Sequence, residues 1–483
     1  MGTTSSYSIR TTSAGGTTLE STTVTGSTIV PGTISNTAAV TAASLVAGAT
    51  TSYTITFTTD VILRVGSVIS LQFPILSFSK IVFTSATLSG LTGINAASTV
   101  VQIASPYIRL IIAGADIAAS TPVSITYANI INPAAQTSTV FGVDTRNPAG
   151  AILQVNAAVP GLTYTSATLP SATVTPVSYF AGIVTDYNVV FANSAYLPPE
   201  SRVEITFPTR FDISSVSFSH SSNLPTVNTV FTLSSADTGR ITLGNTAVVA
   251  GTGRAFTLET IVNPGSSCDQ FIVEYCTTTW EAYTMTLTDS GGNVFEQLTT
   301  ISGTPVVKKP LTYGRVRPLL KTPNTLTVAT VTLDTLAKIP LNGFIEAELP
   351  ADYSIGAVPI TASDLVNIPS ASTAVTATSS SVKLQIAGAS IPATTGISFT
   401  FDKVTTPSNS AVGNFVVRTR DAGGNTIEES STIGGEGCTY VNDCSGHGTC
   451  TLLSKVCICN TGWGAPTDIA DYKSPDCSTR GYL

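Results

Sequence analysis

Charged residues are scarce in this sequence. They make up 11% of 483 residues, with 22 lysines and arginines against 29 aspartates and glutamates, so the net charge is −7. A surface that neutralises nucleic-acid phosphates needs clustered cations, so we expect no nucleic acid as a partner. Apolar runs are short as well: the most apolar stretch, YIRLIIAGADIAA, is interrupted by Arg109 and Asp116. A membrane helix needs about 20 apolar residues, so we expect no membrane insertion.

Histidine is rare, and nucleotide-binding motifs are missing from the sequence. The only histidines are His220 and His447, one in a serine-rich segment and one in a cysteine-rich segment. A Ser/His/Asp hydrolase therefore lacks a credible base. There is no phosphate loop, no dinucleotide fingerprint and no regular Asp/Asn-Gly calcium repeat. We expect the protein not to be an enzyme and to hold no cofactor.

Serine and threonine are abundant instead, at 133 of 483 residues. Together with valine and isoleucine, the β-branched threonines favour strands over helices. No Asn-x-Ser/Thr sequon occurs, so N-glycosylation is not predicted. Tracts such as TTLESTTVTGST could carry O-glycans, or could simply be solvent-facing threonines on strands.

The sequence repeats itself. Residues 47–57, AGATTSYTITF, match residues 181–191, AGIVTDYNVVF, and both run on to a Phe-Pro pair. A weaker third copy begins with LTVATVTL at residues 326–333. Each copy ends in a strand, a glycine-bearing turn and another strand, which is typical of a hairpin: FGVDTRNPAGAILQV, TMTLTDSGGNVFEQL and FVVRTRDAGGNTIEES. Internal repeats of this length indicate tandem domains.

The pattern within a copy predicts the fold. Tyr53, Ile55 and Phe57 alternate with threonines, as in a strand that is buried on one face. About eight such runs per copy, separated by turn residues, predict an antiparallel β-sandwich of immunoglobulin-like or jelly-roll type. The connecting stretches are rich in proline and should be stiff. We therefore predict an all-β protein of three tandem antiparallel β-sandwich repeats in an extended rod, with boundaries at 27–160, 161–304 and 305–435.

Residues 1–26 contain a fourth copy of the terminal hairpin alone, YSIRTTSAGGTTLES. Two explanations fit. The hairpin is the end of an upstream copy in a longer array, or it donates strands to an exposed sheet edge of another subunit. A repeated head-to-tail contact of the second kind does not have to close and gives filaments. The candidate assembly residues are Ile9, Arg10, Gly15, Gly16 and Leu19.

Six of the eight cysteines lie in residues 436–483: Cys438, Cys444, Cys450, Cys457, Cys459 and Cys477. A segment this small needs covalent links to fold, and spacing alone leaves about fifteen pairings open. The run DCSGHGTCTLLSKVCICNTGWG resembles an epidermal-growth-factor-like (EGF-like) module of the tenascin and teneurin type. The resemblance implies a small disulfide-rich module with pairs 438–450, 444–457 and 459–477. Disulfides place the protein outside the cell or at its surface.

Two further cysteines, Cys268 and Cys276, lie in an insertion peculiar to the second copy, and we expect them to pair. No metal is expected in the cysteine-rich segment. A Cys-x-x-Cys knuckle for zinc is missing, and the segment GGEGC lacks the acidic motif that calcium-binding EGF-like modules carry before their first cysteine.

Five of the 22 cations cluster between the second and third copies: Lys308, Lys309, Arg315, Arg317 and Lys321. This basic linker patch could dock an acidic surface of a neighbouring subunit or an acidic glycan. Otherwise it is simply a solvated linker.

The texture of the whole chain resembles the repetitive β-sandwich surface proteins of algae and other protists, some of which build extracellular filaments. On this basis we expect a structural subunit of an extracellular fibre or cell-surface coat that associates with itself, with glycans as further candidate partners. The alternative is a cell-surface adhesion ectodomain that binds a receptor or a carbohydrate. A fibre subunit needs complementary ends, and residues 1–26 offer a candidate. An adhesin needs an exposed binding site, and Trp280 and Trp463 form no evident aromatic cluster.

Overall fold

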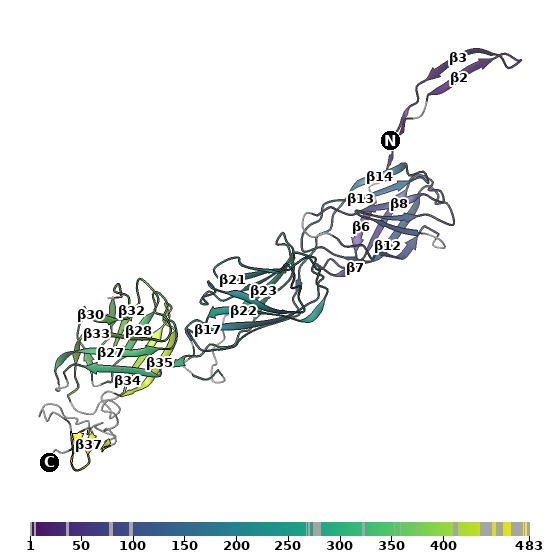
Figure 1. The fold of residues 1–483 in the computed structure, drawn as a ribbon. Coiled ribbons are helices and arrows are strands. Elements are labelled where there is room, and N and C mark those ends of the chain that lie inside the picture. The colour runs from purple at the N-terminus through teal and green to yellow at the C-terminus, as the bar shows by residue number, and fades with distance from the viewer. Residues whose placement is uncertain are drawn as a thin grey trace.

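The computed structural model describes residues 2–3, 6–34, 38–76, 81–95, 100–266, 268, 271–273, 282–320, 324–351, 353–357, 359–372, 374–408, 414–434, 447–450, 457–464, 477 and 479–480. These residues form strands and turns and no α-helix, so the predicted all-β fold is confirmed. None of them belongs to a helix long and apolar enough to span a bilayer. Figure 1 shows three β-sandwiches arranged end to end, with a hairpin projecting at the N-terminal end.

Domain 1 pairs a six-stranded sheet with a four-stranded sheet. The six-stranded sheet has the order β10-β11-β8-β13-β14-β5 and the four-stranded sheet has the order β6-β7-β12-β9. The strands are β5 (Gly32–Thr33), β6 (Ala39–Ala42), β7 (Thr50–Thr59), β8 (Val68–Gln72), β9 (Thr87–Thr92), β10 (Val100–Ala104), β11 (Tyr107–Ile111), β12 (Thr121–Ile131), β13 (Phe141–Arg146) and β14 (Ile152–Val159).

Domain 2 repeats this topology, with sheets ordered β15-β24-β23-β18-β21-β20 and β16-β17-β22-β19. Its strands are β15 (Ala167–Thr168), β16 (Ser171–Pro176), β17 (Val184–Asn193), β18 (Arg202–Thr206), β19 (Ser217–Ser222), β20 (Val230–Leu233), β21 (Thr238–Thr242), β22 (Gly251–Val262), β23 (Tyr283–Thr288) and β24 (Val294–Ile301).

Domain 3 keeps the same plan, with sheets ordered β25-β35-β34-β28-β32-β31 and β26-β27-β33-β29, and an extra strand, β30, beside β33. Its strands are β25 (Lys309–Pro310), β26 (Tyr313–Pro318), β27 (Leu326–Thr335), β28 (Phe344–Glu348), β29 (Ser354–Ile355), β30 (Ala362–Val366), β31 (Val375–Ala377), β32 (Ser381–Gln385), β33 (Thr395–Thr405), β34 (Asn414–Arg420) and β35 (Thr426–Gly434).

Each domain has one feature that the alternating pattern did not predict. A two-residue strand at the start of the domain runs parallel to the last strand: β5 beside β14, β15 beside β24, and β25 beside β35. Strands this short carry no detectable period, so the sequence predicts about eight strands per copy, whereas the described residues form ten strands in domains 1 and 2 and eleven in domain 3. The parallel strand covers the edge that the last strand would otherwise expose.

The alternating residues form the cores. In domain 1, Tyr53, Ile55 and Phe57 point inward and are buried. The matching Tyr187, Val189 and Phe191 are buried in domain 2, as are Ala329, Val331 and Leu333 in domain 3. Two large aromatic clusters follow, around Phe73 and around Phe207. Each domain thus has a hydrophobic core of its own.

The remaining strands lie outside the sandwiches. Near the N-terminus, β1 (Gly2–Thr3) pairs with β4 (Thr28–Ile29), and β2 (Tyr7–Thr12) pairs with β3 (Thr18–Val24) as a separate hairpin. Near the C-terminus, β36 (Gly448–Cys450) pairs with β37 (Cys457–Cys459), and β38 (Trp463–Gly464) pairs with β39 (Thr479–Arg480).

Five buried tyrosines have a raised pKa, and four of them lie in two pairs. Burial raises the pKa of Tyr53 and of Tyr187, and the neighbouring Tyr164 and Tyr283 raise them further. Burial also raises the pKa of Tyr164, to about 12, and that of Tyr283. All four lie in domains 1 and 2 or in the connection between them.

We therefore predict that domains 1 and 2 lose stability in alkali. The folded-state pKa values lie above the ordinary value of 10.0, so the stabilisation is complete below about pH 10 and falls as the pH rises beyond it. Absorbance of tyrosinate and circular dichroism, recorded together, should change at the same pH for this group of tyrosines. Ionisation of all tyrosines near pH 10 with an unchanged fold would contradict the prediction.

Candidate functional site: the junctions between domains

The end of domain 1 that faces domain 2 is organised by one asparagine. Asn132 follows β12, and its side-chain amide donates to the carbonyl oxygens of Ser44 and Val46, both at 2.9 Å. The Tyr53 hydroxyl donates to the Asn132 Oδ1 at 2.6 Å. These bonds fix the loop that contains Gly48. A buried amide with every group satisfied gives a loop one defined shape.

Domain 2 repeats this arrangement. The Asn263 side chain donates to the carbonyl oxygens of Ser178 at 2.8 Å and Phe180 at 2.9 Å, and it accepts a bond from the Tyr187 hydroxyl. The loop held in this way contains Gly182. Domains 1 and 2 therefore present the same loop to the domain that follows.

Both loops touch the next domain at a glycine. Gly48 has a φ of 66° and Gly182 a φ of 67°, in the left-handed region that glycine adopts easily. A Cβ on Gly48 would lie 2.5 Å from the Cβ of Ala195 in domain 2, and one on Gly182 would lie 2.9 Å from the Cβ of Ala337 in domain 3. Neither contact leaves room for a side chain, so both the conformation and the packing require glycine.

Main-chain hydrogen bonds cross both junctions at equivalent positions. The Tyr196 N–H donates to the Gly48 oxygen at 3.2 Å, and the Lys338 N–H donates to the Gly182 oxygen at 3.3 Å. Beside them, the Ala135 N–H donates to the Val294 oxygen at 2.8 Å. The two junctions therefore share a hydrogen-bond pattern as well as a glycine contact.

The second junction has additional contacts. Ser266 and Thr426 exchange two main-chain bonds, at 2.7 and 3.1 Å, and the Gly265 N–H donates to Asp421 Oδ2 at 3.1 Å. Ala181, Val306, Ala337 and Ile427 form a small apolar cluster in which every member is buried. This junction is a packed interface rather than a flexible hinge.

The segments that connect the domains are also bonded to the junction loops. Between domains 1 and 2, Thr165 receives a bond from the Ala47 N–H at 2.8 Å and donates to the Leu45 oxygen at 2.9 Å. Val307 has the same role at the second junction, with Ala181 and Tyr179 and both distances at 2.9 Å. These connections are therefore held as short parallel strand pairs.

The facing end of each sandwich is fixed by a buried polar side chain in its last strand. Glu296 Oε1 accepts bonds from the Ser194 and Ala195 N–H groups, at 2.9 and 3.0 Å. Glu428 accepts from the Leu336 N–H at 2.8 Å in the equivalent loop of domain 3. These loops carry Ala195 and Ala337, the alanines against which Gly48 and Gly182 pack. In domain 1 the equivalent residue is Gln154, which accepts a bond from the Thr59 hydroxyl.

Domain 3 departs from this plan at its far end. Asn324, with a φ of 53°, stands where Gly48 and Gly182 stand in the other domains, and Thr406 replaces the asparagine that holds their loops. A side chain at the glycine position would collide with the next sandwich. The far end of domain 3 is therefore not shaped to dock another sandwich in the same way.

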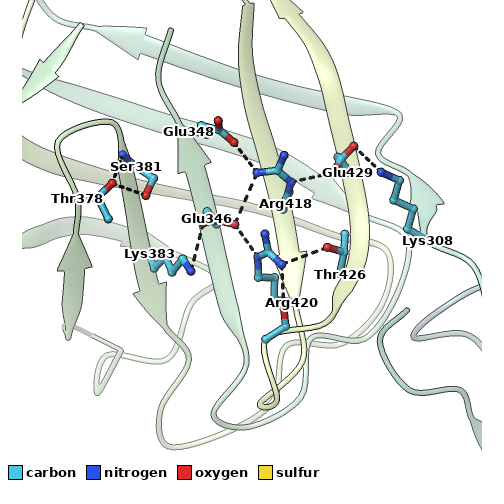
Figure 2. Close-up of polar contacts among 11 residues, drawn as sticks. Lys308, Glu346, Glu348, Thr378, Ser381, Lys383, Arg418, Arg420, Thr426 and Glu429 are labelled. Carbon is cyan, nitrogen blue, oxygen red and sulfur yellow. Dashed lines mark hydrogen bonds and ion pairs between the residues drawn. The ribbon is translucent and has the colours of Figure 1, made fainter. Parts of the chain in front are cut away.

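A network of charged side chains crosses one face of domain 3 (Figure 2). It runs from strand to strand through residues that lie opposite or diagonal to one another. Its members are Lys383 on β32, Glu346 and Glu348 on β28, Arg418 and Arg420 on β34, Glu429 on β35, and Lys308 just before β25. Opposite charges on neighbouring strands stabilise a sheet. The network also attaches the connection from domain 2 to the face of domain 3.

Lys308 is the least exposed cation of this network, with 6% of its side chain accessible. Its Nζ lies 2.8 Å from Glu429 Oε1 and 4.6 Å from the centre of the Phe271 ring, which belongs to the insertion in domain 2. Burial would raise the pKa of Glu429, but hydrogen bonds and charge from Lys308 and Arg418 outweigh it, so the pKa is lowered. Glu429 therefore stays ionised between two cations.

The structure describes four of the five residues of the basic linker patch, and these four do not form one exposed cationic surface. Lys308 is buried and paired with Glu429. Lys309 lies in β25, where its charge lowers the pKa of Glu428 against the larger effect of burial. Arg315 and Arg317 lie on β26, and each has interaction partners. Lys321 lies outside the described residues.

Of the predicted disulfides, the structure describes the pair Cys459–Cys477, with Cα atoms 5.3 Å apart. Cys268 and Cys457 are also disulfide-bonded. Cys276, Cys438 and Cys444 lie outside the described residues, and of Cys450 only the main chain is described. His447 stacks on Trp463 with ring centres 3.4 Å apart, and Trp280 is not described. Among the side chains that are described, no group of three could hold a metal ion.

Sequence reasoning did not identify the junction glycines as functional residues. The signal was present, because both strong copies begin with Ala-Gly, at residues 47–48 and 181–182, and the third copy does not. The asparagines that hold these loops stand in Asn-Pro pairs at 132–133 and 263–264, where the third copy has Thr-Pro.

No protein-family profile and no curated protein sequence matches the chain. Similar solved structures include a protein from Corynebacterium diphtheriae described as membrane-anchored, at 12% identity over 82% of this chain and 89% of that one, with a TM-score of 0.18. The Escherichia coli adhesin FdeC is similar at 14% identity over 84% and 100% of the two chains, with a TM-score of 0.20. The Staphylococcus aureus collagen adhesin is similar at 11% identity over 56% and 97%, with a TM-score of 0.17.

We predict that Gly182→Ala opens the second junction. The added methyl would lie 2.5 Å from Ile427 Cγ2, so domains 2 and 3 must move apart. Hydrogen exchange at the Lys338 and Thr426 amides, which bond across the junction, should become at least about tenfold faster. Gly292→Ala is the matched control, because Gly292 also has a positive φ but nothing lies within 4 Å of its added methyl. Equal exchange in both variants would contradict the account.

We also predict that Lys308→Ala destabilises domain 3 by about 2–3 kcal/mol, because it removes a charged hydrogen bond from a buried carboxylate. Lys383→Ala removes another cation of the same network, whose side chain is 40% exposed, and should cost less than about 1 kcal/mol. Urea-dependent hydrogen exchange in β35 measures both. Equal losses would show that burial of Lys308 contributes nothing.

Proposed function

We propose that this chain is a rigid extracellular rod, part of a cell-surface ectodomain that holds an adhesive end away from the cell. The observation that carries the proposal is the repetition of one packed junction between successive sandwiches. Interfaces between domains are usually small, so relative motion is the ordinary expectation. Here the glycine contact, the main-chain bonds and the short connections act together against such motion.

The location at the cell surface is supported by the cysteines. Cys268, Cys457, Cys459 and Cys477 are all disulfide-bonded, and disulfides persist in oxidising compartments. Among described cysteines none is free. The cysteine-rich segment after domain 3 would then be a module outside the cell, in keeping with its EGF-like sequence pattern.

A second candidate function, a subunit of an extracellular fibre, is favoured by a different observation. The hairpin β2–β3 stands apart from the sandwiches, and its side chains are exposed. An exposed pair of strands is a template for another sheet. A fibre subunit would use it as an assembly contact, whereas a solitary adhesive rod would not need it.

The rod predicts one shape in solution. Small-angle X-ray scattering of the oxidised full chain should give a single maximum dimension that stays constant from low to high salt, because the junction contacts are apolar contacts and main-chain bonds. Surface ion pairs between domains, such as Lys338 with Asp212 at 3.2 Å, are exposed and add little. A broad or salt-dependent distribution of dimensions would mean hinged domains and would contradict the proposal.

The two candidate functions differ in solution behaviour. Sedimentation and negative-stain electron microscopy of the full chain, beside a version lacking residues 1–26, separate them. Filaments that form from the full chain and vanish on truncation are expected of a fibre subunit. Monomeric rods from both chains would contradict self-assembly and leave the adhesive rod.

A further inference from the structure

The N-terminal hairpin has the same turn as the last hairpin of every sandwich. The Gly16 N–H donates to the Ser13 oxygen at 2.9 Å and the Ser13 N–H to the Thr17 oxygen at 2.8 Å. The same two bonds occur at residues 147–151, 289–293 and 421–425. The glycine has a positive φ in all four turns, 82° at Gly16, and no atom lies within 4 Å of its Cβ position.

Next to the turn, the four hairpins share one strand register, including one irregularity. The complete hairpins have a second irregularity farther from the turn that β2–β3 does not have. In β2–β3, Thr11 lies opposite Glu20 and Thr12 opposite Thr18, so Leu19 is an extra residue. The three complete hairpins have the same bulge, which leaves Leu153, Phe295 and Ile427 as the extra residue. Because the β-bulge occurs at the same position in all four hairpins, it is a regular feature of this repeat.

This register identifies the face of the hairpin that belongs in a core. Tyr7 and Ile9 correspond to Phe141 and Val143 of domain 1, which are both 0% exposed. In the N-terminal hairpin the same two positions are 57% and 55% exposed. The equivalent pairs in the other domains, Tyr283 with Met285 and Phe415 with Val417, are buried as well. The hairpin thus has a core-facing side with no core upon it.

The connection from the hairpin to domain 1 also matches. In the connections that follow domains 1 and 2, residues 160–166 and 302–308 separate the last hairpin strand from the next parallel strand. Residues 25–31 separate β3 from β5 and have the same length. Val306 and Val307 are 0% exposed; Val306 packs with Ala181 of domain 2, and Val307 bonds to the main chain of Tyr179 and Ala181. At the first junction the equivalent Tyr164 is buried, whereas Thr165 is exposed. Their counterparts Ile29 and Val30 are 64% and 66% exposed. Among the described residues, none forms a sandwich over this end of domain 1.

Glu20 indicates what the missing sandwich must offer. It stands at the position of Glu296 and Glu428, which are 0% exposed and accept main-chain N–H bonds from the loop after the long strands β17 and β27. In the hairpin this strand is fully exposed. A partner would therefore provide a loop whose main-chain N–H groups bond to the Glu20 carboxylate. It would also provide a strand edge that pairs with β2 as β8 pairs with β13.

We propose that residues 7–24 complete a β-sandwich of this same repeat type, supplied by a partner molecule whose own last hairpin is missing. None of the sandwiches within residues 1–483 is open in this way, because each contains its own hairpin. The partner docks on domain 1 as domain 1 docks on domain 2. Val61 occupies the position that Ala195 and Ala337 occupy in domains 2 and 3. Because a valine side chain has two more carbon atoms than an alanine side chain, the partner's loop must leave more room than the loops at Gly48 and Gly182 do. The inference rests on the second candidate function and names its partner.

The test in trans uses an open sandwich made from this chain. The acceptor is residues 1–281, which lacks domain 3 and the hairpin β23–β24 of domain 2 but keeps the Gly182 loop, with Ile9→Glu added so that it cannot associate with itself. The donor is the intact full chain. Sedimentation of the mixture should show a one-to-one complex, with hydrogen exchange in β2–β3 slowed by at least about a hundredfold.

Donor variants give the specificity. Ile9→Glu places a charge in the proposed core and should weaken the complex at least about a hundredfold. Ser21→Glu adds the same charge on the outward side, where Glu429 stands in domain 3, and should bind like the unaltered donor. Glu20→Gln should also bind, because Gln154 fills this position in domain 1, whereas Glu20→Ala should bind at least about tenfold more weakly.

A second version of the experiment guards against an acceptor that fails to fold. Residues 161–281 are joined directly to Ser6 of the full chain, because Tyr283 and Tyr7 are equivalent. Slow exchange in β2–β3 of this fusion, together with the complex in trans, supports the proposal. Slow exchange in the fusion without any complex overturns the separate partner. Fast exchange in the fusion, with no complex, overturns the whole inference, while the rod dimensions of the full chain still test the proposed function independently.

Discussion

The arrangement of this protein depends on a close approach of two main chains at each junction. Gly48 and Gly182 bring the end of one sandwich against an alanine of the next, at a distance that excludes any side chain. The other junction elements hold in place the two loops that meet at this contact. The asparagines fix the loop that carries the glycine, the buried glutamates fix the loop that carries the alanine, and the short connections hold both loops in register. A repeated local contact therefore becomes a regular rod.

The fold could be predicted because the sequence patterns that specify its strands and turns are local. The alternation around Tyr53 and Tyr187 predicts strands, and the glycine-bearing turns predict the closing hairpins. The two-residue parallel strands were not predictable, because they have no period and exist only through their partners. The junctions were missed for a similar reason. The meaning of Gly182 depends on Ala337, more than 150 residues later, and no local pattern links them.

The charged residues show the same limit. Lys308 looked like a member of a solvated or partner-binding patch, because the sequence shows only its cationic neighbours. In the folded chain its partner is Glu429, brought beside it by the parallel pairing of β25 with β35. In a chain with so few charges, a network concentrated on domain 3 holds the connection from domain 2. The EGF-like resemblance concerns mostly residues outside the described part of the chain.

The central claim is that the two junctions have one geometry. Val100, Val230 and Ala374 occupy equivalent positions beside β11, β21 and β32. Spin labels placed there in pairs, through unnatural amino acids that spare the disulfides, would allow pulsed electron paramagnetic resonance to measure both junctions. The account predicts two narrow distance distributions, one for 100 with 230 and one for 230 with 374, with closely matching means. A broad distribution at either junction, or two clearly different means, would contradict it.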